Sequence, residues 1–501
     1  MLNALLLAAH ASAATVKTDE SARRWVATAI ERMGGPAALS SLATSTLRLE
    51  WVGYRNLLEQ SERPEGPWIP QIERTVEIWD ARGGRWDETI EATIAEDTYS
   101  IRTIVADGAA ARRFGETWGP AGKADIVEAQ EWMALAPQQL LLDAAAAPDL
   151  RREPDTTLQG VHHHVVSFGS GEDRRRIFLN GETGFLTAVE IRRPYPESLY
   201  WQVWGDVTTR VQYSYWDIRP GGLGLFYPLQ WDVERGGRPW RSLTITKLEP
   251  GAAPPAGAFV IPDAAKDEFA ERSKHSLKDP AFGNPSRPAV ELSPGVVYVP
   301  GSWGVALVHQ GDGVVVLEAP ISAGYSARVL EDAARRFPDV PVKAVVTTSD
   351  SWPHIGGIRE YAARGIPVYL LDHNVAQIRR ALESPHRIHP DALSRAPRKP
   401  ILRPVSGRTV LGTGPNRIEL LPARTETGER MMLAFLPESG LLYASDLFQA
   451  GRGGPPEYAW EVADVARREH LQVRTVFAMH SDPTPWEKLV ELVKAAPPPV
   501  R

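Results

Sequence analysis

The stretch Val345-Val346-Thr347-Thr348-Ser349-Asp350-Ser351-Trp352-Pro353-His354-Ile355-Gly356-Gly357 decides how the C-terminal part of this chain is interpreted. An apolar run typical of a buried strand enters a polar turn, one histidine follows, and a glycine pair precedes a segment with helical spacing. The stretch therefore predicts a strand, a turn and a helix, with His354 in the turn.

Strands and helices alternate on both sides of this turn. Strands are expected at 305–308, 314–317, 342–347, 366–371, 417–421, 431–436, 441–444 and 473–479, and helices at 328–337, 355–364, 374–384 and 485–495. Two strand-rich halves flanked by helices predict an αββα sandwich.

The region 293–501 resembles the metallo-β-lactamase superfamily at four points, which follow one another in the family's order. They are the hairpin 295–301 with 314–320, the turn 348–357, the strand pair 431–437 with 441–448 that ends at Asp446, and the strand 476–480 that ends at His480. The resemblance implies the scaffold of a binuclear hydrolase, in which a metal-bound hydroxide attacks an ester, lactam, thioester or phosphodiester.

Most metal ligands of that family are replaced in this chain. When His354 and the glycine pair fix the register, Ser349 and Ser351 stand at the first two histidine positions and Pro353 at the aspartate position. The middle histidine position falls on Thr427, or on Arg424 if a short insertion is allowed. Serine and proline do not hold zinc at neutral pH. The resemblance therefore implies that the ligands of one metal are absent.

His354, Asp446 and His480 remain of the second metal's ligands, and they leave two alternatives open. The primary hypothesis is a pseudo-hydrolase with a binding or scaffolding role, no metal, and the three residues kept as a hydrogen-bonded cluster. The alternative is a hydrolase with a single zinc or other divalent ion on these residues, where Asp446 and His354 would serve catalysis. A serine nucleophile, Ser349 or Ser351 beside His354 and Asp446, is a further possibility.

Residues 20–260 form a different unit, rich in aromatic residues. Twelve of the sixteen tryptophans lie there, and after a helix at 21–33 the segments alternate apolar with polar residues. This pattern predicts a large, mostly antiparallel sheet. The helix and the long aromatic meander resemble the LolA-like lipoprotein-carrier half-barrel, which implies an acyl chain or another apolar ligand on the concave face. The tryptophans equally suit a packed core.

Two groups of histidines fall outside the motif. His162-His163-His164 is expected on a strand, where neighbouring side chains point to opposite faces, so three in a row cannot converge on one ion and a strand surface is predicted. His386 and His389 lie between Pro385 and Pro390, which predicts exposed histidines in an irregular loop.

Composition excludes several classes of partner. A formal charge of −6 with both signs interspersed offers no basic stripe for nucleic acid, and no apolar run after the N-terminus is long enough to span a membrane.

Residues 1–14 read as a secretory signal peptide, so a periplasmic or secreted protein is expected, and the absence of cysteine excludes a lipoprotein anchor. The Pro- and Ala-rich segment 261–292 predicts a linker before an α+β domain at 293–501. Oligomeric state and the identity of a small-molecule ligand stay open.

Overall fold

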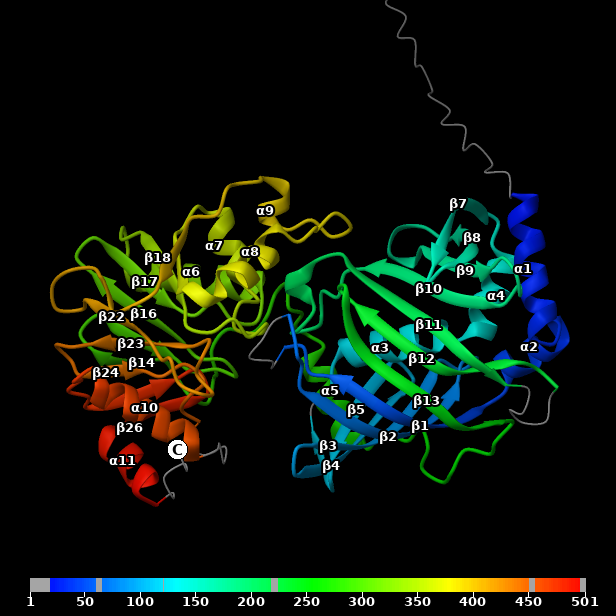
Figure 1. Ribbon diagram of the computed structural model, residues 1–501. Coiled ribbons are helices and arrows are strands. Elements are labelled where there is room, and N and C mark those ends of the chain that lie inside the picture. The colour runs from blue at the N-terminus through cyan, green and yellow to red at the C-terminus, as the bar shows by residue number, and fades with distance from the viewer. Residues whose placement is uncertain (1–18, 60–64, 120, 218–223, 450–455, 496–501) are drawn as a thin grey trace, which may run out of the picture.

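The computed structural model describes residues 19–59, 65–119, 121–217, 224–449 and 456–495. The expected signal peptide at 1–14 lies outside these described residues. Helices are combined with one large antiparallel sheet and two smaller mixed sheets, which confirms the α+β class (Figure 1).

The first sheet has thirteen strands among the described residues, in the order β6-β5-β4-β3-β2-β1-β13-β12-β11-β10-β9-β8-β7. Its strands are β1 (Leu47–Asn56), β2 (Pro70–Asp80), β3 (Arg85–Ile94), β4 (Asp97–Ala106), β5 (Ala109–Phe114), β6 (Thr117–Gly119), β7 (Arg151–Leu158), β8 (Val161–Phe168), β9 (Arg175–Asn180), β10 (Leu186–Arg193), β11 (Val207–Asp217), β12 (Tyr227–Arg235) and β13 (Arg238–Pro250). Every neighbouring pair is antiparallel. Among the described residues, the α-helices between successive strands of this sheet are α3 (Lys123–Ala134) and α4 (Pro137–Ala146), which lie between β6 and β7.

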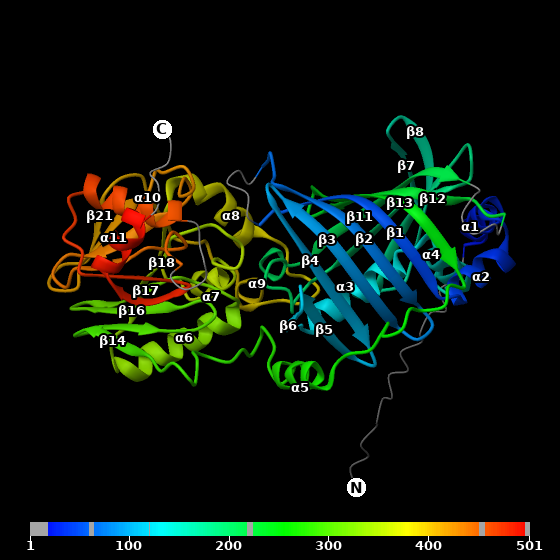
Figure 2. The same cartoon turned by 90° about the horizontal axis from the view of Figure 1, so that it is seen from below.

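The sheet curls around its own helices. Figures 1 and 2 show the sheet bent around α3 and α4, with α1 (Glu20–Met33) and α2 (Pro36–Thr44) at one end. The indole rings of Trp51, Trp132 and Trp231 meet at centroid distances of 5.1–6.0 Å. These tryptophans therefore form the core, as the packed-core interpretation of the sequence expects.

Buried charges line the concave side of this sheet. Glu77 accepts hydrogen bonds from the indoles of Trp51 (2.8 Å) and Trp79 (2.9 Å). Arg241 pairs with Glu73 at 3.0 Å. Because an acyl chain cannot satisfy buried carboxylates and guanidinium groups, this lining disfavours an apolar ligand on the concave face.

The C-terminal part contains the other two sheets. The seven-stranded sheet, in chain order, comprises β14 (Val290–Ser293), β15 (Val296–Val299), β16 (Val305–Gln310), β17 (Gly313–Leu317), β18 (Val342–Thr347), β19 (Val368–Leu371) and β20 (Leu402–Val405). The six-stranded sheet comprises β21 (Thr409–Leu411), β22 (Ile418–Pro422), β23 (Met432–Leu436), β24 (Leu441–Tyr443), β25 (Thr475–Ala478) and β26 (Ser481–Pro485). The helices are α6 (Ala323–Arg336), α7 (Ile358–Ala363), α8 (Val375–Glu383), α9 (Ala392–Arg395), α10 (Pro456–Arg468) and α11 (Trp486–Ala495).

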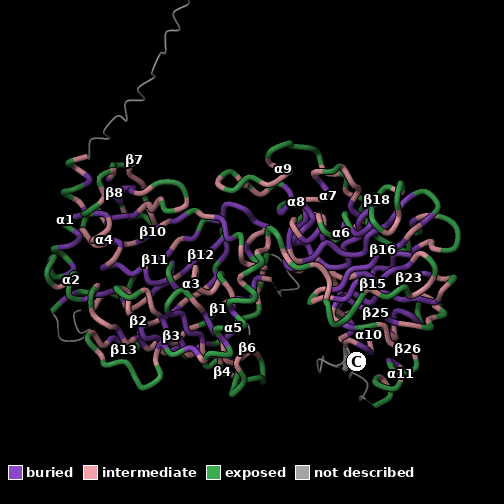
Figure 3. The backbone as a smooth tube through the Cα atoms, turned by 180° about the vertical axis from the view of Figure 1, so that it is seen from behind, coloured by how far each residue is buried: buried purple, intermediate pink, exposed green. Residues whose placement is uncertain are grey.

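Alternate side chains of these strands fill separate layers of an αββα sandwich. Residues such as Val315 of β17 meet Leu420 of β22 between the two sheets. Val316, the next residue along β17, faces the helices and shares a core with Val329 of α6. The outer face of the second sheet packs against α10 and α11. Both faces of each sheet are therefore covered, which explains the continuous apolar strands in the sequence and the buried interior in Figure 3.

The segment 261–292, which the sequence predicts as a linker, contains a helix. This helix, α5 (Asp263–Arg272), buries Ala265 and Phe269. Ala265 joins the apolar cluster of Ile104 and Ala111, in β4 and β5 of the large sheet. The sequence did not predict this helix, because the surrounding segment is rich in Pro and Ala. The helix buries only two apolar side chains, and the strands that they contact are distant in sequence.

A short turn of the N-terminal part packs directly on the turn that carries His354. The 3₁₀ helix η2 (Gln202–Trp204) follows Trp201, and the rings of Trp201 and Trp204 meet Trp352 edge-on at 4.9 and 5.0 Å. Gln202 Nε2 donates to the backbone oxygens of Ile321 (2.8 Å) and Gly356 (3.2 Å). The large sheet and the sandwich are therefore joined at this turn.

No helix among the described residues combines the length and apolar character that crossing a bilayer would need.

Candidate functional site

His354, Asp446 and His480 meet at one edge of the sandwich. His354 lies in the turn after β18, Asp446 follows β24 and His480 follows β25, so each stands just beyond the carboxyl end of a strand. His354 Nε2 is 2.8 Å from Asp446 Oδ2, and His480 Nε2 is 3.1 Å from Asp446 Oδ1. One carboxylate thus faces two imidazoles, one with each oxygen.

The two histidines have different surroundings. His480 is partly exposed; its Nδ1 lies 3.0 Å from the carbonyl oxygen of Ser302, and Trp303 packs against its ring at 5.6 Å. His354 is 2% exposed, and its Nδ1 is buried without a hydrogen-bond partner among the described residues. The cluster therefore meets solvent at Asp446 and His480, while His354 is enclosed.

A buried carboxylate, Glu318, lies behind the cluster and was missed by the sequence analysis. Glu318 directly follows β17, and its Oε1 accepts hydrogen bonds from both the backbone N–H and the hydroxyl of Thr348. The Thr348 hydroxyl lies 2.7 Å from Ser445 Oγ. Glu318 and Ser445 both have positive φ, 82° and 51°, a region that costs energy for residues other than glycine. This network joins the ends of three strands beneath His354.

The protonation states within the cluster depend on one another. Burial favours a neutral Asp446, but the charge and hydrogen bond of His354 and the hydrogen bond of His480 hold the pKa of Asp446 well below its usual range. Burial would lower the pKa of His354, yet Asp446, Glu318 and Asp350 together raise it above its usual value. Burial also raises the pKa of Glu318 to about 7. The cluster therefore favours an ionised Asp446 beside an imidazolium at position 354.

The three replaced positions of the motif turn lie next to His354 in the structure. The carbonyl oxygen of Ser351 accepts a hydrogen bond from the backbone N–H of His354 at 2.9 Å. The hydroxyl oxygen of Ser349 accepts one from the backbone N–H of Ser351 at 3.1 Å. Among the described residues no hydrogen bond joins a serine hydroxyl to His354, so the geometry gives no support to a serine nucleophile. Pro353 accepts from Ile321 N at 2.8 Å, which anchors the turn to the loop before α6.

Thr427 and Arg424, the two candidates for the middle histidine position, are held by other residues. The Thr427 hydroxyl donates to Glu461 of α10 at 2.6 Å, and Arg424 binds Asp372 at 2.8 Å. Asp350, in the motif turn itself, pairs with Arg430 at 2.6 Å. The structure thus brings the motif turn, Asp446 and His480 together, but ties Thr427 to α10.

His386, which the sequence predicts as an exposed loop residue, is enclosed at the junction with the large sheet. Its side chain is 10% exposed and lies against Gly205, where an added Cβ would stand 2.5 Å from the ring. Burial, together with the charge of Arg359, lowers the pKa of His386 to about 4. The expectation was wrong for His386, because Asp206 accepts the backbone N–H groups of Arg387 and Ile388 and draws the loop onto the sheet. His389 is exposed, as expected.

The residues present determine which metal centre could fit here. A pair of metals does not fit, since Ser349, Ser351 and Pro353 offer no nitrogen or carboxylate ligand. A single ion has three candidate ligands, because one donor atom each of His354, Asp446 and His480 lies within 4.8 Å of the others. Such an ion would have to replace both imidazole contacts of Asp446 and take the place of the proton on His354.

Comparisons with known proteins give structural similarities only. No family model and no curated protein matches the sequence. The chain is similar to the solved structure of a metallo-β-lactamase from Pontibacter korlensis, with 13% identity, 41% of this chain and 96% of that chain covered, and a TM-score of 0.33. It is also similar to metallo-β-lactamases from Erythrobacter litoralis (16% identity, 41% and 94% covered, TM-score 0.32) and Hirschia baltica (16%, 42% and 97%, 0.32).

Proposed function

We propose that the chain is an exported protein of the metallo-β-lactamase superfamily with a degenerate metal site, a pseudo-hydrolase that binds or scaffolds. The observation that carries this proposal is the closed arrangement of Asp446, both of whose oxygens face an imidazole. A raised pKa at His354 supplies a positive charge next to this carboxylate without any metal. A buried carboxylate needs a partner of opposite charge, and the imidazolium serves as that partner.

A binding role is supported by a cavity between the large sheet and the sandwich. Its volume is about 890 Å³, and its walls come from η2, β11, β12 and α8. Trp201 and Trp204 offer aromatic faces, while Arg238 and Arg380 offer guanidinium groups. The same lining carries the carboxylates of Glu190, Asp206, Glu234 and Glu383, so it would suit a polar ligand with a flat or apolar part.

Metal analysis combined with activity assays tests the pseudo-hydrolase proposal. The full chain is incubated with zinc, manganese and iron(II), freed of loose metal and assayed with a chromogenic cephalosporin, p-nitrophenyl acetate, a thioester and bis(p-nitrophenyl) phosphate. We expect no turnover above that of an Asp446→Asn variant. Turnover that requires added metal and Asp446 would overturn the proposal in favour of the second candidate.

The second candidate is a hydrolase with one divalent ion, and the convergence of three ligand types favours it. His354 and His480 would offer Nε2, and Asp446 one oxygen. A bound ion would supply a Lewis acid and lower the pKa of a water molecule. In this candidate Glu318, behind Thr348, is a positioning residue for the motif turn, because its carboxylate holds the backbone that carries His354.

Export is proposed from the N-terminal sequence alone and has its own test. Expression of the full chain in a bacterium, followed by fractionation and N-terminal sequencing, should recover a mature chain that begins after the Ala11-Ser12-Ala13-Ala14 segment. An unprocessed chain in the cytoplasmic fraction would contradict export.

A further inference from the structure

The hairpin β7–β8 gathers an acidic and two histidine side chains on one face, far from His354. His162 and His164 are two residues apart on β8, so both point to the same side of the strand. In β7 the register shifts between Glu153 and Thr156, which marks a bulge that includes Pro154 and Asp155. Proline cannot donate a ladder hydrogen bond, and bulges redirect a side chain. The bulge therefore directs Asp155 towards both histidines.

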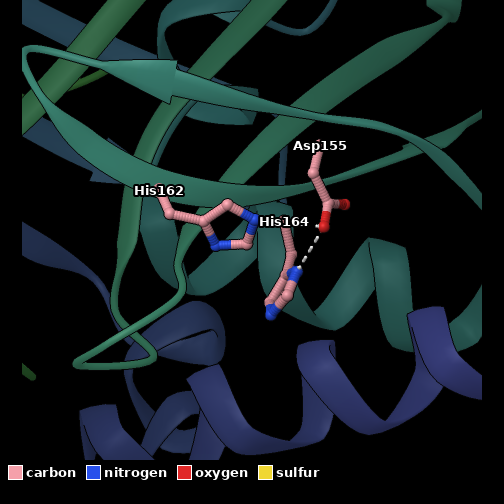
Figure 4. A group of neighbouring side chains, drawn as sticks. All are labelled: Asp155, His162 and His164. Atoms are coloured by element: carbon pink, nitrogen blue, oxygen red, sulfur yellow. Dashed lines mark hydrogen bonds and ion pairs between the residues drawn. The ribbon is translucent and has the colours of Figure 1, made fainter.

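The donor atoms of these three residues converge. Asp155 Oδ2 lies 3.2 Å from His162 Nε2 and 3.2 Å from His164 Nδ1, and Figure 4 shows Asp155 and His164 facing each other. One donor atom of each residue lies within 4.8 Å of the other two. The second carboxylate oxygen, Asp155 Oδ1, is buried and has no hydrogen-bond partner among the described residues. One carboxylate and two imidazole nitrogens thus offer three donor atoms on a single face of the hairpin.

The His164 ring is fixed from the side of the N-terminal helix. Trp25 of α1 stacks on it with a centroid distance of 4.0 Å and an interplanar angle of 3°. Stacking restricts the rotation of the imidazole and keeps Nδ1 towards Asp155. The site is therefore partly preorganised, and α1 contributes to it although it supplies no ligand.

We propose that Asp155, His162 and His164 bind one transition-metal ion of the class that prefers imidazole, such as zinc. Bonds of about 2.0–2.1 Å to a tetrahedral ion place neighbouring donor atoms roughly 3.3 Å apart, and the two observed separations are 3.2 Å. Water completes the coordination, since His162 is 53% exposed. The prediction of a plain strand surface is thereby revised: His163 points to the other face, but its two neighbours share one face with Asp155.

A competing cation adjoins the site. Arg152 Nη2 is also 3.2 Å from Asp155 Oδ2, and its guanidinium lies over the Trp25 ring at 5.1 Å. The guanidinium keeps this aromatic partner when an ion takes Asp155. Replacement by glutamine removes the repulsion between two positive charges. Arg152→Gln should therefore bind zinc several-fold more tightly than the parent chain.

Zinc titration of the full-length Asp446→Asn variant tests the proposal without interference from the His354 cluster. We expect one equivalent to bind, by calorimetry and by the absorption spectrum of a cobalt(II) substitute. His162→Ala and Asp155→Asn, each added to this background, should weaken binding at least tenfold. His389→Ala changes an exposed histidine elsewhere and should leave the affinity unchanged. His162 is half-exposed, so its removal does not threaten the fold.

A second readout follows from the position of the site between α1 and the hairpin. Zinc that binds only the folded chain raises its melting temperature, and this rise should vanish in the His162→Ala variant. Equal zinc affinity in the His162→Ala and His389→Ala variants would overturn the proposal, as would the absence of binding in the Asp446→Asn background. Neither result bears on the pseudo-hydrolase proposal. That proposal is tested by the turnover that the parent chain shows and the Asp446→Asn variant lacks.

Discussion

Replacing Asp446 by asparagine keeps the shape of the side chain and removes the charge between His354 and His480. Asp446 is 18% exposed and makes two contacts, at 2.8 and 3.1 Å, with imidazole nitrogens. A hydrogen bond to a charged group contributes about 1.5–3 kcal/mol, and the amide oxygen of asparagine can preserve one of the two contacts. The variant should therefore lose about 1.5–3 kcal/mol of folding free energy at pH 6.

The loss should depend on pH in a defined direction. The pKa of His354 is raised in the folded protein above its ordinary 6.5, so its contribution is complete below 6.5 and disappears as the pH rises through the folded-state value. The pKa of Asp446 is depressed below its ordinary 3.8, so its contribution is present above 3.8 and disappears as the pH falls towards the folded-state value. The difference between wild type and variant should be largest between pH 4 and 6.5.

Thermal unfolding from pH 4 to 9 measures this difference. We expect the Asp446→Asn variant to melt several degrees below wild type near pH 6 and to approach it above the folded-state pKa of His354. Ser351→Ala serves as the matched control in the same turn and should follow wild type at every pH. A melting difference that is constant with pH, or that grows above pH 8, would refute the charge pair as the origin of the stability.

The remaining predictions concern metal, activity and the buried carboxylate. By elemental analysis, the parent chain should hold at most one equivalent of zinc more than the Asp446→Asn variant. A difference of two equivalents would contradict the inference that the ligands of a binuclear site are absent. If the parent chain hydrolyses any substrate, the Asp446→Asn variant should be inactive and the Ser351→Ala variant should keep nearly all of the activity. An inactive Ser351→Ala variant beside an active Asp446→Asn variant would favour a serine nucleophile. Glu318 has a folded-state pKa of about 7 against an ordinary 4.5, so the fold loses stability as the pH rises from 4.5 through 7. At pH 8 the Glu318→Gln variant should therefore be more stable than wild type, by up to about 3 kcal/mol of unfolding free energy, and should melt at a higher temperature. At pH 4 the two proteins should be equally stable.

Local patterns predicted the elements that hold the site. The apolar run before Ser349 is β18, and Asp446 and His480 follow β24 and β25 at the same edge, because parallel strands of a sandwich end together. Helix α10 was not predicted, although its apolar residues Ala459, Val462 and Val465 recur at helical spacing and pack together on the second sheet. Helix α5 was missed for another reason, because it lies in a segment rich in Pro and Ala.

Interactions between distant residues were beyond local patterns. Glu318 follows β17 without any motif, and only its bonds to Thr348, thirty residues away, reveal its place beneath His354. Asp155 gives a similar example: a period of two places His162 and His164 on one face, but the bulge that adds the carboxylate depends on the register with β7. Exposure of His386 was predicted from its prolines, whereas its burial comes from Asp206, which lies just before β11 of the large sheet.

The three tryptophans at the junction also determine how the chain should unfold. Trp201, Trp204 and Trp352 belong to one uninterrupted apolar cluster, which extends from Trp51 and Trp231 in the curved sheet to Ile355 and Val329 in the sandwich. Separation of the two parts would expose three indole rings to water at once. This exposure costs free energy, so unfolding of one part alone is disfavoured. We expect a single cooperative heat-capacity peak for the whole chain, and two halves that aggregate when they are produced apart.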